Sequence, residues 1–265
     1  MKRLLIFLYG ITSYAVFLAT FLYAVGFIGN VWVPKTLDSP RDIGFGNALA
    51  IDLGLLALFA VQHSVMARPA FKSWWTRLIP AATERSTYVL FSSLALILLF
   101  YGWQPLGGSI WTITSSAGVT TMYALFAAGW ALLLYVTFLI DHFDLFGLRQ
   151  VWLELRGRPH TPVPFVTPWL YRQVRHPLYI GWLMVVWATP AMTVSHLVFA
   201  AMCTAYILVG VRLEERDLIH FHPEYAEYRR RVPMLLPFRR RTNVPAAGGM
   251  NVSGDSSSNL RRLQP

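Results

Sequence analysis

Charged residues are scarce in this chain: they make up 14% of its 265 residues, whereas 55% are hydrophobic. Soluble domains are about one quarter charged, so this composition excludes an ordinary soluble domain and favours a polytopic membrane protein. Cysteine is nearly absent too, because Cys203 is the only one and lies within an apolar run. That count excludes a disulfide within the chain and a cysteine-ligated metal, and we predict no metal site.

Acidic residues are outnumbered, since 13 Asp and Glu residues stand against 23 Lys and Arg, giving a net charge of +10. The basic residues lie mainly between apolar segments and after the last one. This distribution suits the anionic surface of a membrane better than the groove of a nucleic acid. We therefore expect membrane lipids as partners and no nucleic acid.

Long apolar segments dominate the rest of the chain. Four of them lie at roughly residues 4–28, 45–66, 87–103 and 118–140. Most approach the about 20 residues that a membrane-spanning helix needs. A fifth apolar region, 178–213, contains Pro190 and small residues near its middle, which predicts a helical hairpin rather than one long helix. The predicted fold is all-α, with four transmembrane helices and a C-terminal hairpin whose first arm either spans the membrane or re-enters it.

Basic residues orient the predicted helices. Lys2 and Arg3 precede the first helix, and further basic residues follow the second and the fourth: Arg68, Lys72, Arg77, Arg85, Arg149, Arg156, Arg158, Arg172 and Arg175. The connection between the third and fourth helices carries no charge. The positive-inside rule then predicts that both termini are cytoplasmic. Residues 1–238 would form the membrane-embedded domain, and the polar, basic segment 239–265 a disordered cytoplasmic tail.

Threading the helices in this orientation brings ionisable residues from several segments to the cytoplasmic boundary. Acids and imidazoles near lipid are costly and by default mark a functional site. A hairpin places the start of its first arm beside the end of its second, so Arg175 and His176 should face Glu214 and Glu215. Such a set could bind a zwitterion that also carries a cation, with Arg175 on its carboxylate and the glutamates on its ammonium group or hydroxyls.

Two motifs carry a family resemblance: "RHPLYIG" at 175–181, followed by "EERDL" at 214–218. Together they resemble the cofactor signature of the isoprenylcysteine carboxyl methyltransferase-like and phospholipid methyltransferase-like membrane enzymes. The resemblance implies an S-adenosylmethionine pocket closed by the C-terminal hairpin, with Tyr228 and "RRRVPMLLPF" beside it. The cofactor-binding residues that it implies are Arg175, His176, Pro177, Tyr179, Gly181, Glu214, Glu215 and Tyr225.

Three N-terminal motifs narrow the resemblance: "QHSVMARPAFK" at 62–72, "ERSTYVL" at 84–90 and "DHFDLFGLRQVW" at 141–152. They are similar to the nurim-related branch of these enzymes, and the similarity covers about residues 1–238. This resemblance implies an S-methyltransferase that converts a small thiol, methanethiol, to dimethyl sulfide. It further implies a bacterial inner-membrane protein whose active site faces the cytoplasm.

Methyl transfer from a sulfonium to a thiolate removes charge, so a water-poor site at a membrane border favours the step. A cysteine-like thiol has a pKa of about 8.5 and is mostly protonated at neutral pH, so a base is expected. His142, oriented by Asp141 or Asp144, is the first candidate, and His63 is the second. An interfacial imidazole that takes no part in chemistry is the alternative for each.

Three other functions remain open. A sibling enzyme would methylate a lipid headgroup or a prenylcysteine carboxylate with the same cofactor residues. A nurim-like protein would have no catalytic activity. A haem protein would need two imidazoles facing one another at the same depth, for which only His63 and His142 qualify. The sequence leaves the oligomeric state open as well.

Overall fold

The computed structural model describes residues 1–161, 167–221 and 224–237, and they are mostly helical. Five helical segments of the described chain are long and apolar enough to cross a membrane. They are α1 (Lys2–Gly29), α2 (Phe45–Ala67), η1 with α4 (Ala81–Thr83 and Glu84–Gly102), α5 (Ser116–Ile140) and α9 (Val194–Phe221). The first four match the four predicted segments, and α9 is the second arm of the predicted hairpin. The predicted tail, 239–265, lies outside the described residues.

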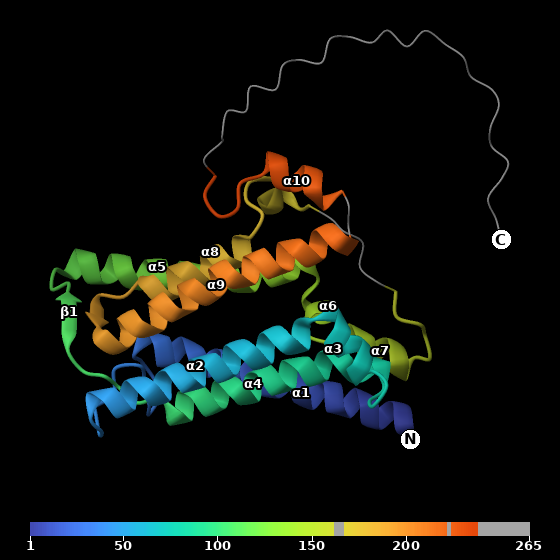
Figure 1. Ribbon diagram of the computed structural model, residues 1–265, viewed down its shortest axis with the longest axis horizontal. Helices are drawn as coiled ribbons and strands as arrows, with labels where there is room; N and C mark the ends of the chain where they lie inside the picture. Colours follow the sequence, from blue (N-terminus) through green and yellow to red (C-terminus); the bar gives the residue numbers. More distant parts are fainter. Residues whose placement is uncertain (162–166, 222–223, 238–265) are drawn as a thin grey trace, which may run out of the picture.

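Shorter elements cap the two ends of the bundle. They are α3 (Pro69–Trp75), β1 (Ser109–Thr112), α6 (His142–Leu145), α7 (Leu148–Leu155), η2 (Trp169–Arg172), β2 (Ala191–Thr193) and α10 (Tyr225–Arg231). The chain's N-terminus, α3, α7 and α10 lie at one end of the bundle, which we call the N-terminal end, whereas β1 lies at the other (Figure 1). The basic connections that follow α2 and α5 therefore share an end with the N-terminus.

The hairpin has unequal arms. Its first helix, α8 (Pro177–Trp187), has 11 residues and is about 16 Å long, too short to cross a membrane alone. The chain continues from α8 as β2, which pairs antiparallel with β1 so that Ser109 lies opposite Thr193. The hairpin tip therefore reaches the end of the bundle where β1 lies. The break near Pro190 was predicted, but the expected all-α fold omitted this two-stranded sheet.

Buried and partly buried polar contacts hold the hairpin tip in place. Asp38 accepts hydrogen bonds from the Asn30 side chain, at 2.6 Å, and from the Thr193 hydroxyl. The fully buried His196 ring contacts the Val186 carbonyl oxygen through Nε2 at 2.9 Å. Ser195 Oγ accepts from the Leu106 backbone amide at 2.6 Å. These bonds join β2 to the connection after α1, and α9 to α8 and to the connection after α4.

Small residues let α8 approach α5 closely. A Cβ atom built on Gly129 would lie 3.0 Å from the Gly181 carbonyl oxygen, from Met184 Cβ and from Val185 Cγ2. A Cβ atom on Gly181 would lie 2.9 Å from Leu133 Cγ. Membrane helices associate largely through such close packing, because lipid provides no hydrophobic drive between them. This contact fixes the position of α8 and hence of the residues at its start.

Replacing Gly129 by valine is expected to lower the free energy of unfolding by about 1–3 kcal/mol, since the added atoms would force α8 away from α5. Thermal unfolding of the purified protein in detergent measures the change. Gly54→Val is the matched control, because a Cβ atom there meets nothing within 4 Å. Equal shifts for the two variants would contradict the close-packing argument.

Candidate functional site

A buried charge cluster forms where the two arms of the hairpin meet. Glu215 accepts hydrogen bonds at Oε1 from Arg175 Nε, at 2.7 Å, and from His176 Nε2, at 3.0 Å. Its Oε2 atom lies 3.0 Å from Arg229 Nε. The side chains of Arg175, His176 and Glu215 are only 9%, 5% and 5% exposed. The hairpin therefore joins Arg175 to Glu215, as the sequence predicted.

The cluster also attaches the segment after α10 to the start of α8. Arg175 N donates to the Pro233 carbonyl oxygen at 2.9 Å, and His176 N donates to that of Met234 at 3.1 Å. Arg175 Nη1 donates to the carbonyl oxygens of Arg229 and Val232. Most of the Arg175 guanidinium is thus bonded within the protein. The role expected of it, binding a ligand carboxylate, falls more readily to the half-exposed Arg229 guanidinium.

Glu214 differs from its neighbour in exposure. Its carboxylate is 45% exposed and accepts a hydrogen bond from the Tyr179 hydroxyl at 2.9 Å. His176 Nδ1 lies 3.9 Å from the same oxygen. Successive residues of a helix point about 100° apart, so one glutamate faces the protein while the next faces solvent. Glu214 is therefore the carboxylate available to a ligand, and Glu215 is the one that holds the site together.

The remaining predicted cofactor residues divide between the cluster and its supports. Tyr225 is buried, and its hydroxyl lies 3.5 Å from Glu215 Oε1. Pro177 is the first residue of α8, a position where its missing N–H costs nothing. Gly181 lies in the contact between α8 and α5, so in this fold its small size serves helix packing.

His63 lies in a second polar cluster, formed by α2, α4 and α9. The Tyr88 hydroxyl is 2.8 Å from His63 Nε2, and Ser92 Oγ is 3.1 Å from Nδ1. On the next residue of α2, Ser64 contacts the Tyr206 hydroxyl at 3.1 Å. The sequence analysis did not single out Tyr88, Ser92 or Tyr206, because a lone hydroxyl in an apolar helix has no distinctive spacing.

The His63 cluster faces the hairpin. The rings of His63 and Tyr206 lie with centroids 6.4 Å apart. The imidazole therefore lies beside a phenol of α4 and a phenol of α9, the second arm of the hairpin.

His142 is placed differently from the prediction. Its ring is buried, with Nε2 2.8 Å from the Tyr14 hydroxyl and Nδ1 2.8 Å from Thr137 Oγ1. Burial lowers the pKa of His142, which the charge of Asp141 opposes. The expected orientation of the imidazole by a carboxylate hydrogen bond is wrong: hydroxyls from α1 and α5 hold both nitrogens. The Asp141 carboxylate instead accepts from the Asp144 backbone amide.

Asp144 belongs to a surface network. It lies 2.9 Å from both Arg149 Nη1 and His160 Nε2. Burial alone would raise the pKa of Asp144, but hydrogen bonds from His160 and Arg149 outweigh burial and lower it. The two imidazoles considered for a haem, those of His63 and His142, have both ring nitrogens in contact with hydroxyls in the described part of the chain.

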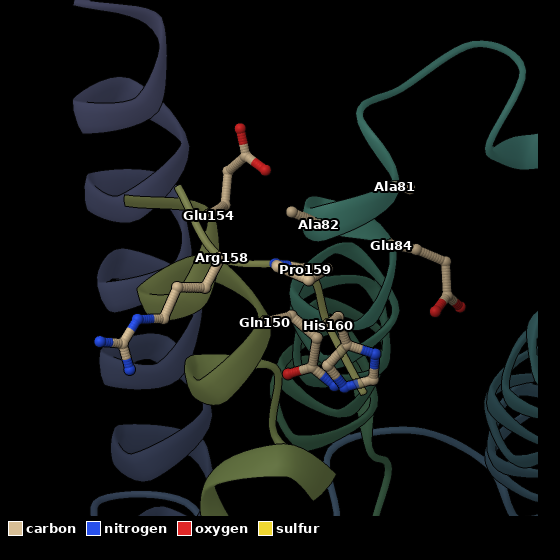
Figure 2. Close-up of a pocket in the computed structure, with 8 residues that line it drawn as sticks. All are labelled: Ala81, Ala82, Glu84, Gln150, Glu154, Arg158, Pro159 and His160. Carbon is tan, nitrogen blue, oxygen red and sulfur yellow. The ribbon is translucent and has the colours of Figure 1, made fainter. Parts of the chain in front are cut away.

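A cavity of about 280 Å³ opens at the N-terminal end of the bundle (Figure 2). Its side chains come from the start of α4, from α7 and from the turn after α7: Ala81, Ala82, Glu84, Gln150, Glu154, Arg158, Pro159 and His160. The predicted cofactor residues do not line it. This cavity and the hairpin cluster are therefore separate features of the same end.

The five membrane-length helices of the described chain are typical of the integral membrane protein class. Within it, the chain is 57% identical over 239 residues to a methanethiol S-methyltransferase of Crocosphaera subtropica, covering 90% of this chain and 94% of that protein. A methanethiol S-methyltransferase of Mycobacterium tuberculosis is 51% identical over 242 residues, covering 91% and 99%. The chain therefore belongs to this family of S-methyltransferases.

A more distant relative, nurim of Xenopus laevis, is 31% identical over 196 residues, covering 71% of this chain and 68% of that protein. This similarity confirms the nurim-related branch predicted from the N-terminal motifs. No family model matches the chain. No solved structure matches it either.

Proposed function

We propose that this protein methylates methanethiol to dimethyl sulfide, with S-adenosylmethionine as the methyl donor. The observation that carries the proposal is the unequal pair of glutamates: Glu215 is buried against Arg175 and His176, whereas Glu214 is half exposed. The relatives at 51% and 57% identity are methanethiol S-methyltransferases, which supports the choice of a thiol acceptor.

The residues present suit this donor. The Glu214 carboxylate, steadied by Tyr179, can accept hydrogen bonds from an ammonium group or from ribose hydroxyls, and the Arg229 guanidinium can pair with a carboxylate. When bound, S-adenosylmethionine supplies an electrophilic methyl group on a sulfonium. Arg175, His176, Glu215 and Tyr225 hold the hairpin and α10 in position; Pro177 and Gly181 set where α8 begins and how closely it packs.

The proposed base is His63, because its ring lies beside Tyr206 of α9, the helix that also carries Glu214. His142 and Asp141 are proposed to shape the site from α1 and α5 rather than to take the thiol proton. The membrane is proposed to be the bacterial inner membrane, with the N-terminal end of the bundle in the cytoplasm. The basic connections at that end support this orientation.

The purified full chain in detergent, supplied with S-adenosylmethionine and methanethiol, is expected to produce dimethyl sulfide, measured by gas chromatography of the headspace. A reaction without donor sets the background. Phosphatidylethanolamine and a prenylcysteine serve as competing acceptors. Methylation of either one without dimethyl sulfide would favour the lipid-acting sibling, and absence of donor binding would favour a noncatalytic nurim-like protein.

A further inference from the structure

Hydroxyl groups of α4 contact both ring nitrogens of the proposed base, His63. The Tyr88 hydroxyl lies 2.8 Å from His63 Nε2, while Ser92 Oγ lies 3.1 Å from Nδ1. Both ring nitrogens of His63 are thus in contact with hydroxyls on α4. A thiol that reaches this cluster would therefore meet a hydroxyl rather than a free ring nitrogen.

We infer that Tyr88 is the catalytic residue that takes the thiol proton, and that it passes its own phenolic proton to His63. This inference rests on the proposed function and concerns how the thiol acceptor loses its proton. His63 and Ser92 act through Tyr88 and are positioning residues. We assign the ring proton to Nδ1, which donates to Ser92 Oγ at 3.1 Å. The Nε2 lone pair then faces the Tyr88 hydroxyl, which lies 2.8 Å from Nε2 and 3.2 Å from Nδ1.

The proton and electron balance closes without any further reactant. The thiol S–H bond breaks as a new O–H bond forms on Tyr88, and the original phenolic proton bonds to His63 Nε2. The acceptor sulfur forms a bond to the methyl group, while the electron pair of the broken carbon–sulfur bond stays on the donor sulfur as a neutral thioether. The sulfonium's positive charge is replaced by that of an imidazolium at His63.

The surroundings of Tyr88 suit this role. The Arg85 guanidinium lies 5.4 Å from the centre of the Tyr88 ring, where its charge stabilises negative charge developing on the phenol oxygen. The other charged or titratable groups that act on Tyr88 are Tyr206, Glu84 and Arg68. Phe59 stacks on the His63 ring with centroids 5.2 Å apart, which gives a small apolar acceptor a carbon-lined wall.

Tyr88→Phe tests the inference in the full chain. At pH 7 the kcat for methanethiol is expected to fall about 100-fold, the low end of the range for general acid–base catalysis. The deficit should shrink as pH rises, because the thiolate then forms in solution, about tenfold more per pH unit while the thiol is mostly protonated. Binding of S-adenosylhomocysteine, measured by calorimetry, should stay unchanged. Tyr23→Phe, which removes a hydroxyl bonded to the Lys35 carbonyl oxygen, is the control and should keep the wild-type pH profile.

The tautomer of His63 can be measured without S-adenosylmethionine or thiol, by nitrogen-15 NMR of labelled histidine. The His63 signal is identified by its loss in His63→Asn. We expect a protonated Nδ1 and an unprotonated Nε2 in the wild type. The inference would be overturned if the Nε2–H form of His63 dominated. It would also be overturned if Tyr88→Phe lowered kcat equally at every pH, did not lower kcat, or lost S-adenosylhomocysteine binding. Absence of dimethyl sulfide from the wild type at every pH would instead overturn the proposed function.

Discussion

Glu215→Gln is expected to unfold the hairpin site. The substitution removes the charge that Arg175, His176 and Arg229 share and puts an amide N–H₂ among their donors. Removing one partner of a buried ion pair costs about 3–5 kcal/mol, because the remaining charge stays buried without compensation. We therefore expect a large drop in the melting temperature and loss of S-adenosylmethionine binding in the same variant.

Thermal unfolding and calorimetry on the detergent-purified chain measure both effects. Glu227→Gln makes the same chemical change on α10, where the carboxylate is exposed and pairs with Arg230 and Arg231. Exposed pairs contribute little to stability, so this control should keep the wild-type melting temperature. If Glu215→Gln had the melting temperature of the wild type, the cluster would not be what holds α10 against α8.

The helices could be predicted because membrane length and apolar composition are local properties. The segments expected at 45–66 and 118–140 correspond to Phe45–Ala67 and Ser116–Ile140. The pairing of β2 with β1 could not be predicted, because it joins Ala191 to Thr112, which are far apart in the sequence, and neither segment carries a strand pattern long enough to stand out. The helices follow from local apolar patterns, whereas the position of the hairpin tip depends on its pairing with the distant strand β1.

The candidate site was predictable where connectivity dictates proximity. A hairpin must bring residue 175 close to residue 215, and the structure joins them. Which of two adjacent glutamates points inward depends on the rotation of α9, and the sequence holds no such information. The partners of His142 come from Tyr14 and Thr137, and Tyr14 is 128 positions away along the chain. Adjacent aspartates were the natural expectation from sequence, but they were the wrong partners.

Glu214→Gln separates ligand binding from stability. The Glu214 side chain is 45% exposed, so the folded protein loses little when its charge is removed. A bound cation or hydroxyl, however, would lose a charge-assisted hydrogen bond, which contributes about 1.5–3 kcal/mol. The affinity for S-adenosylmethionine should therefore fall about 10- to 100-fold while the melting temperature stays near that of the wild type.

The matched control lies on the same helix. Asp217→Asn also neutralises a half-exposed carboxylate, but this one pairs with Arg68 at 2.8 Å and holds α2. The affinity of this variant for S-adenosylmethionine should match that of the wild type. Tyr179→Phe should weaken binding less than Glu214→Gln does, because the carboxylate keeps its charge and loses only a hydrogen bond that steadies it. Unchanged affinity in Glu214→Gln would leave the exposed glutamate without a ligand, and the donor would have to bind elsewhere on the protein.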